Sequence, residues 1–156
     1  MDALARNADR CSLAAEGLRS WGTLKVRAAG GSMLPTLWPG DVLTVQYARP
    51  DQVEPGEIVL YTRQGRFFVH RIVSRDLSGD AMSLLTCGDC MAAADPPVGR
   101  GELLGRVVEV RRSGSSFVPA RKLSLSGRLL AWAFGHWNLF RRVGLRLRTY
   151  GCEGDD

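Results

Sequence analysis

The sequence predicts a mainly β protein whose strands form a coiled antiparallel sheet or partial barrel. Between residues 23 and 111, about six short segments have strand-like patterns, and no helical pattern lies among them. The chain has 18 glycines and 7 prolines, which supply the turns that many short strands need. Its 156 residues, 45% of them hydrophobic, are enough to bury one ordinary core.

A short helix is expected before the sheet. Residues 2–20 contain leucines among several alanines, a pattern typical of a helix that ends near Gly17 or Gly22. The segment 29–40 is rich in Gly and Pro and is expected to be a loop or short turn. The strands are predicted over residues 23–28, 41–47, 57–62, 66–74, 82–86 and 103–111.

The residues after the sheet are expected to form a linker and amphipathic helices. The linker is predicted over residues 113–119, and one or two helices over residues 121–148, with Gly135 and Gly144 as candidate breaks. The chain is thereby divided into an N-terminal helical segment, a central β domain and a basic helical tail, at residues 1–22, 23–112 and 120–150.

The net charge of +5 belongs to the C-terminal third of the chain. Residues 1–99 hold 10 Lys and Arg against 11 Asp and Glu, whereas residues 100–150 hold 11 against 2. Nucleic-acid binding is weakly supported, because no RNP-like or helix-turn-helix pattern accompanies the charge. The mixture of aromatic and Arg residues in the tail fits a peripheral contact with an anionic membrane, or a helix that packs its apolar side on the domain, with packing favoured.

No segment is long enough to cross a bilayer. The longest uncharged hydrophobic stretch near either terminus covers residues 129–140, whereas a spanning helix needs about 20 apolar residues. Charged residues interrupt the N-terminus, so no signal peptide is expected there. We therefore expect a cytoplasmic protein, peripheral to a membrane at most, with its four cysteines reduced: Cys11, Cys87, Cys90 and Cys152.

The loop after the first predicted strand holds a candidate nucleophile. Residues 30–37 read Gly-Gly-Ser-Met-Leu-Pro-Thr-Leu, which places Ser32 after two glycines and before Pro35. The glycines allow a close backbone approach or a positive φ, and the proline restricts the turn. A nucleophile requires a hydroxyl held in this way on a rigid loop. The alternative interpretation is an ordinary Gly-Pro turn that contains a serine.

A nucleophilic serine needs a base within hydrogen-bonding reach. The conventional bases in the chain are His70, His136, Lys25 and Lys122, since every other Lys or Arg position is arginine. His70 lies in a largely apolar predicted strand, where a half-buried imidazole is suited to act as general base. The alternative for His70 is a structural histidine in a sheet. His136 falls in the C-terminal helix, where packing or exposure is expected.

Two carboxylates follow in a turn-rich stretch. Asp89 comes directly after Gly88, and Asp95 precedes two prolines that restrict its backbone. Either carboxylate could orient the imidazole, as in a Ser-His-Asp relay. The alternative for both is turn chemistry, because Asp is favoured beside Gly and Pro.

The pair Cys87 and Cys90 invites a metal or redox interpretation. A structural zinc site needs four ligands, and no second cysteine pair of this kind is present. A thioredoxin-type motif would need a βαβ setting, which is also missing. The two cysteines are therefore expected to be turn residues, and no metal or cofactor is expected.

Four sequence boxes occur in order between residues 23 and 111. They are Gly31-Ser32-Met33-Leu34-Pro35-Thr36, then Pro39-Gly40-Asp41 with Pro55-Gly56-Glu57-Ile58-Val59, then Val69-His70-Arg71-Ile72-Val73, and last Thr86-Cys87-Gly88-Asp89 followed by Asp95. Leu104-Gly105-Arg106-Val107-Val108 is similar to a closing strand. In this order the boxes resemble the signal peptidase I superfamily, which includes the self-cleaving repressors of the LexA type. The resemblance implies the catalytic-domain fold of that superfamily over residues 23–112.

The resemblance also implies roles for individual residues. Bacterial relatives generally pair the serine with lysine, whereas this chain has a histidine in the base box, so it is similar to the archaeal and endoplasmic-reticulum subtype, without a membrane anchor. The N–H of Ser32 would help to form the oxyanion hole, with no side-chain donor two residues earlier, at Gly30. The implied catalytic roles are Ser32 as nucleophile, His70 as general base, Asp95 as third relay member and Asp89 as supporting carboxylate.

The expected function is therefore that of a serine endopeptidase that cleaves a peptide or preprotein by a Ser-His-Asp mechanism. The alternative is a non-catalytic module of the same fold that binds an extended peptide by strand addition. In both cases the expected partner is a peptide or protein, and nucleic acid is not an expected partner. The sequence leaves the oligomeric state open.

Overall fold

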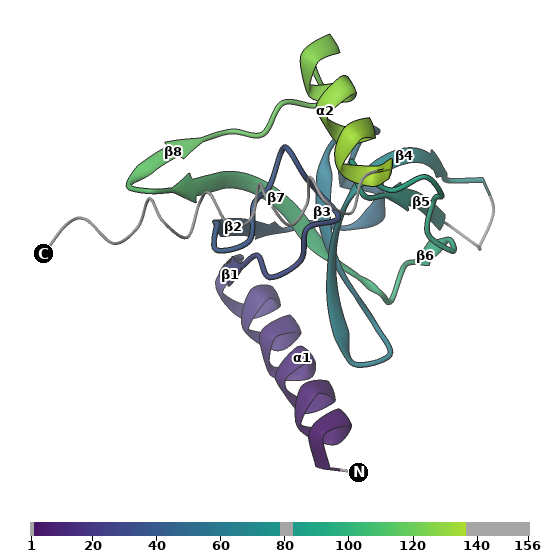
Figure 1. Ribbon diagram of the computed structural model, residues 1–156. Coiled ribbons are helices and arrows are strands. Elements are labelled where there is room, and N and C mark those ends of the chain that lie inside the picture. Colours follow the sequence, from purple (N-terminus) through teal and green to yellow (C-terminus); the bar gives the residue numbers. More distant parts are fainter. Residues whose placement is uncertain (1, 79–82, 137–156) are drawn as a thin grey trace, which may run out of the picture.

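The computed structural model describes residues 2–78 and 83–136, which form an antiparallel sheet with a helix at either end (Figure 1). The helices are α1 (Asp2–Trp21), the short 3-10 helix η1 (Pro50–Gln52) and α2 (Leu125–His136). The strands are β1 (Thr23–Arg27), β2 (Val42–Tyr47), β3 (Ile58–Arg63), β4 (Arg66–Asp76), β5 (Ser83–Cys87), β6 (Val98–Gly99), β7 (Leu103–Arg112) and β8 (Ser115–Phe117). The fold is thus mainly β and antiparallel, as predicted, and the sheet is not closed into a barrel.

The strand order places β3 and β4 in the middle of the sheet. The order is β1-β2-β7-β3-β4-β5-β6, with β8 also paired to β7. Four successive residues of β3, Ile58–Tyr61, are buried, because both faces of this strand are covered. In β4 burial is confined to His70 and Ile72, which lie two residues apart and so face the same side of the sheet. His70 is therefore directed into the protein interior.

The six predicted strands are all present, with ends shifted by one or two residues. The linker predicted over residues 113–119 is partly wrong, because residues 115–117 form β8. Ser113 and Gly114 both have positive φ, 48° and 82°, and form the two-residue turn that folds β8 back on β7. The candidate break at Gly135 lies one residue before His136, the last residue of α2. The other candidate break, Gly144, lies outside the described residues.

Helix α1 ends where the sequence indicates and packs on one side of the sheet. Gly22 follows its last residue with φ of 74° and donates its N–H to the carbonyl of Leu18, which is a left-handed helix cap. Leu18 and Ala15 join a buried cluster with Met33 and Leu37 of the loop after β1 and with side chains of β2, β3 and β7. The loop that carries Ser32 therefore rests on the main core.

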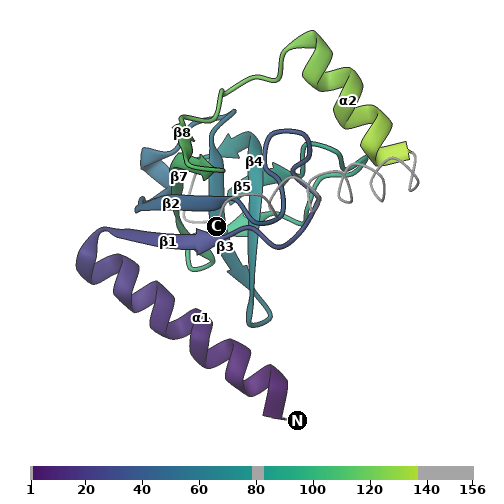
Figure 2. The ribbon, with the colours of Figure 1, turned by 60° about the vertical axis from the view of Figure 1, so that its left-hand side comes forward.

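Helix α2 lies at the opposite end of the sheet from α1 (Figure 2). Its Ala131 packs with Leu34 and Cys90, and the ring of Phe134 meets the ring of Trp38 edge to face at 5.9 Å between centroids. Its buried side thus contacts both the loop that carries Ser32 and the loop that follows β5. No helix in the described part of the chain is long and apolar enough to span a membrane.

Candidate active site

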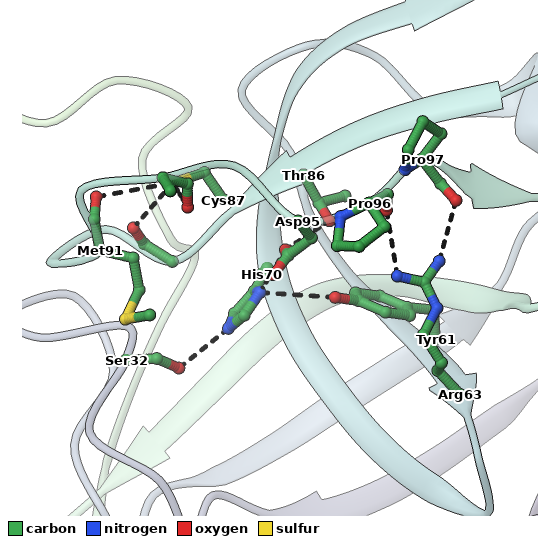
Figure 3. A network of polar contacts seen from close by, with 12 residues as sticks. Ser32, Tyr61, Arg63, His70, Thr86, Cys87, Met91, Asp95, Pro96 and Pro97 are labelled. Atoms are coloured by element: carbon green, nitrogen blue, oxygen red, sulfur yellow. Dashed lines mark hydrogen bonds and ion pairs between the residues drawn. The ribbon is translucent and has the colours of Figure 1, made fainter.

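Three separate segments bring Ser32, His70 and Asp95 together (Figure 3). Ser32 lies on the loop between β1 and β2, His70 in the middle of β4, and Asp95 on the loop between β5 and β6. The Oγ of Ser32 is 3.0 Å from Nε2 of His70, and Nδ1 of His70 is 2.6 Å from Oδ2 of Asp95. The three polar side chains form a continuous hydrogen-bonded line.

The chemistry of the carboxylate decides the direction of these hydrogen bonds. An ionised Asp95 only accepts, so Nδ1 of His70 must carry a proton and donate it to Oδ2. In the neutral imidazole the other nitrogen, Nε2, then has a free lone pair, and it accepts the O–H of Ser32. The His70 side chain is only 8% exposed, so this arrangement is shielded from competing water. It is the arrangement in which an imidazole can take the proton of a serine hydroxyl.

Asp95 is held by a residue that the sequence interpretation did not select. The N–H of Asp95 donates to the carbonyl of Thr86 at 2.7 Å, and the hydroxyl of Thr86 donates to Oδ2 of Asp95 at the same distance. Thr86 is fully buried on β5. The one sequence signal for it was its place in the fourth box, three residues before Asp89.

The aromatic ring of Tyr61 packs against the imidazole of His70. Its ring stacks on Phe68 at 5.3 Å between centroids and meets the ring of His70 edge to face at 6.2 Å. Its hydroxyl lies 3.5 Å from Nδ1 of His70, too far to compete with the contact to Asp95 at 2.6 Å. Burial raises the pKa of Tyr61 to about 12, and the charge of Asp95 contributes to the rise. Tyr61 is therefore neutral at ordinary pH and acts as an uncharged boundary.

Asp89 does not contact His70, so the structure separates the two carboxylates that the sequence left as alternatives. The guanidinium of Arg71 donates to both oxygens of Asp89, at 2.8 and 2.9 Å, and the hydroxyl of Thr36 donates to it as well. The Asp89 side chain is 2% exposed. Asp89 thus joins β4, the loop after β5 and the loop after β1, and its charge is balanced by Arg71.

A close backbone approach near Ser32 occurs at Gly88, which is not one of the two glycines before Ser32 that were expected to permit it. A Cβ on Gly88 would lie 2.7 Å from the carbonyl oxygen of Ser32, closer than side chains tolerate. The neighbouring Cys90 donates its N–H to the same carbonyl at 3.1 Å. The expectation of a positive φ is wrong for both glycines before Ser32, since neither Gly30 nor Gly31 has one. The expectation of a close approach is wrong for Gly30, since a Cβ there would meet nothing within 4 Å.

A buried ion pair holds the end of the Ser32 loop that leads into β2. Asp41 is fully buried and accepts from Arg112 at 3.0 and 2.6 Å and from the N–H of Trp38 at 2.7 Å. Arg112 also donates to the carbonyl of Thr36 at 2.9 Å. Charged hydrogen bonds therefore anchor the part of this loop that follows Ser32 to the last residue of β7.

The backbone N–H of Ser32 is suited to donate a hydrogen bond to an oxyanion. Among the described residues, the N–H of Ser32 finds no acceptor. It is adjacent to the Oγ atom, as a donor to a tetrahedral intermediate must be. Residue 30 is glycine, so the position two residues earlier adds no side-chain donor.

The remaining candidate residues lie elsewhere or have other roles. Lys25 and Lys122 are exposed, and His136 is the last residue of α2. The thiol of Cys90 lies 3.1 Å from the carbonyl oxygen of Gly31 and 3.2 Å from that of Ser32. Burial, with the nearby charges of Asp95 and Asp89, raises the pKa of Cys87. Cys87 is thus a protonated thiol at neutral pH, the less reactive form.

Comparison with known proteins does not identify this chain. No protein-family model matches it, and no curated protein matches its sequence.

Proposed function

We propose that this protein is a serine endopeptidase in which Ser32 is the nucleophile, His70 the general base and Asp95 the residue that orients His70. One observation carries the proposal: the hydrogen-bonded line from Oγ of Ser32 through both nitrogens of His70 to Asp95. Separate segments seldom bring a hydroxyl, an imidazole and a carboxylate into this order for structural reasons alone, because each must be partly desolvated. The resemblance of the sequence boxes to signal peptidase I points to the same class of activity.

The geometry supports two half-reactions. In the first, Oγ of Ser32 attacks the carbonyl carbon of a peptide bond while its proton passes to Nε2 of His70. The N–H of Ser32 then donates to the negatively charged oxygen of the tetrahedral intermediate. When the C–N bond breaks, the imidazolium returns the proton to the leaving amine. In the second half-reaction, His70 takes a proton from a water molecule as the water oxygen attacks the acyl carbon. The ester bond to Ser32 then breaks, the imidazolium returns the proton to Oγ of Ser32, and the carboxylic acid product leaves.

The proposed substrate is an extended peptide with small residues before the cleaved bond. This part of the proposal depends on the superfamily resemblance, since fold-level similarity alone does not define specificity. The oxyanion donor and the nucleophile both belong to Ser32. A substrate peptide must therefore pass close to the loop around Ser32 in order to be cleaved.

The test is covalent labelling by a fluorophosphonate probe, which requires an activated serine but no knowledge of the substrate. We expect the wild-type protein to react and the variants Ser32→Ala and His70→Ala to remain unlabelled. Ser74→Ala, which removes an exposed hydroxyl from the same strand as His70, is the matched control and should react like the wild type. An unreactive wild type would contradict the proposal and favour the peptide-binding alternative.

We further propose that α2 brings the protein to an anionic membrane surface, the interpretation of the basic tail that the sequence favoured less than packing on the domain. Three large side chains at positions i, i+4 and i+7 of α2 are exposed: Leu125 by 79%, Leu129 by 70% and Trp132 by 63%. No acidic residue occurs between Glu109 and Glu153, so the polar residues around this stripe are neutral or basic. Leu, Trp and Arg together are typical of helices that lie in the headgroup region.

Vesicle sedimentation tests this attachment. We expect the protein to pellet with vesicles that contain phosphatidylglycerol and to stay in solution with pure phosphatidylcholine. Replacing Leu129 and Trp132 by Ser should abolish pelleting, whereas the same change at exposed Leu13 of α1 should not. Equal pelleting of the Leu129/Trp132 variant and the wild type would contradict the proposal.

A further inference from the structure

An arginine outside the Ser32–His70 pair holds the segment that follows Asp95. Arg63, the last residue of β3, donates to the carbonyl of Pro96 at 3.0 Å and to the carbonyl of Pro97 at 2.9 Å (Figure 3). The same guanidinium donates twice to the carboxylate of Glu102, each time at 2.7 Å. Arg63 therefore connects the chain just beyond Asp95 with β3 and with the turn before β7.

The two prolines explain why this segment needs an external donor. Proline has no N–H, so Pro96 and Pro97 cannot anchor the chain by donating to a neighbouring strand. Both residues are exposed, as are the four that precede Asp95. Their carbonyls can be held only by donors from elsewhere, and the guanidinium has enough N–H groups to reach both while it pairs with a carboxylate.

Arg63 is itself fixed from two sides. Glu102 also accepts the N–H of Gly99 at 3.0 Å, so the carboxylate is tied to its own turn. The hydrogen bonds from Arg63 lower the pKa of Glu102, which keeps this carboxylate ionised. On the other side, the guanidinium lies 5.6 Å from the centre of the Tyr61 ring, the ring that borders His70. The Arg63 side chain is 21% exposed, less than expected for a solvated arginine.

We infer that Arg63 is a positioning residue for the proposed reaction. By fixing Pro96 and Pro97, it holds the backbone from which the Asp95 carboxylate reaches Nδ1 of His70. Within residues 2–78 and 83–136, Thr86 is the anchor on the other side of Asp95, so loss of Arg63 leaves the Asp95 segment held from one direction. Lysine is not an equivalent, because one ammonium group does not present the planar set of donors that two carbonyls and a carboxylate require. The inference rests on the proposed Ser-His-Asp function.

A double-mutant cycle on the rate of fluorophosphonate labelling tests it. Misplacement of a catalytic group by about 1 Å costs up to about a hundredfold in rate, so we expect Arg63→Ala to slow labelling by about tenfold to a hundredfold. Arg63→Lys should not restore the rate. In an Asp95→Asn background, the added Arg63→Ala change should have almost no effect, because its target is already gone.

Arg75 provides the matched control. It resembles Arg63 in its contacts, since it donates to the carbonyl of Val53 at 2.7 Å and pairs with Glu54 at 2.9 Å, but these contacts hold the turn before β3 and not the segment that follows Asp95. Arg75→Ala should therefore leave the labelling rate of the wild type unchanged. Arg63→Gln replaces Arg63→Ala in the cycle if the alanine variant does not fold.

Two results would overturn the inference while leaving the proposed function in place. One is a wild-type labelling rate in the Arg63 variants. The other is an equal loss of rate from the Arg63 change with Asp95 present or absent, which would indicate a general structural role. A wild type that does not react at all is a different outcome, since it would overturn the proposed function and this inference with it.

Discussion

Two aspartates on one short loop have opposite surroundings in this protein. Asp95 accepts from the imidazole of His70 and from the hydroxyl of Thr86, and both donors are uncharged when His70 is neutral. Asp89, six positions earlier, is bound through both oxygens by the cation of Arg71. The carboxylate that faces the imidazole can stabilise a positive charge that arises there, whereas the carboxylate that faces arginine is already neutralised. The bonding partner of each aspartate, and not the residue type, therefore decides which carboxylate is available for chemistry.

The largest effect is expected at Asp95. Asparagine keeps the size of the side chain, but its amide group can donate to Nδ1 of His70 and thereby favour the tautomer that cannot accept from Ser32. We expect Asp95→Asn to slow fluorophosphonate labelling by about three to four orders of magnitude, as loss of the aspartate does in serine proteases. The melting temperature should change little. A labelling rate close to that of the wild type would contradict the role of Asp95 in orienting His70.

Asp89→Asn should have the opposite effects, a clear loss of stability and a much smaller loss of labelling rate. This change leaves Arg71, whose side chain is 13% exposed, without its charge partner. Breaking a buried ion pair on one side costs about 3–5 kcal/mol, so we expect unfolding by urea at a clearly lower concentration. At temperatures where the variant is folded, serine labelling should fall far less than in Asp95→Asn. If stability is unchanged and labelling is lost, then Asp89 has a catalytic part that its contacts do not indicate.

Smaller effects are expected from removal of the two threonine hydroxyls that donate to the aspartates. Thr86→Val removes the hydroxyl that donates to Asp95, and Thr36→Val removes the one that donates to Asp89. Each hydrogen bond to a charged group contributes about 1.5–3 kcal/mol, so both variants should be less stable. We expect only Thr86→Val to slow labelling strongly, by about tenfold, because misorientation of a catalytic group is costly. Equal labelling rates in the two variants would contradict this expectation.

The smallest expected effect concerns the pH dependence of stability. Hydrogen bonds from Arg63 lower the pKa of Glu102 from its ordinary value of 4.5. Because the folded-state pKa is depressed, the contribution of Glu102 is complete above the unfolded-state value and disappears as the pH falls through the folded-state value. Glu102→Gln should therefore reduce the unfolding free energy by about 1 kcal/mol at pH 7.

At pH 3 the difference between wild type and Glu102→Gln should be smaller than at pH 7. Urea unfolding of both proteins at the two pH values measures it. A constant difference would show that the charge of Glu102 is not what stabilises the turn before β7.

The sequence predicted the local elements well because their causes are local. Alternating side chains and intervening Gly and Pro residues predict each strand separately, and all six predicted strands are present. The strands that were missed lack such a signal. β6 has two residues, and β8 follows a turn in which Ser113, and not glycine, has the first positive φ.

The candidate site was predicted only as a set of residue types. The choice of Ser32 followed from the glycines and proline around it, the choice of His70 from the scarcity of other bases, and the order of the boxes agreed with both. Arg63 had no sequence signal, and Thr86 had only its place in the fourth box, because arginine at the end of a strand and threonine within one are ordinary. Gly88 was named only as the neighbour of Asp89, although its lack of a side chain lets the carbonyl of Ser32 approach.

By itself, the sequence determined the mainly β class, the strand positions and the short set of groups able to act as nucleophile, base and orienting acid. Only the tertiary structure decided which of two aspartates meets His70, which glycine permits close packing and what holds Asp95 in place. The reason is the length of chain between partners: 38 residues separate Ser32 from His70, and 25 separate His70 from Asp95. Local patterns define the direction of each strand, but contacts across such separations depend on how the sheet brings its loops together.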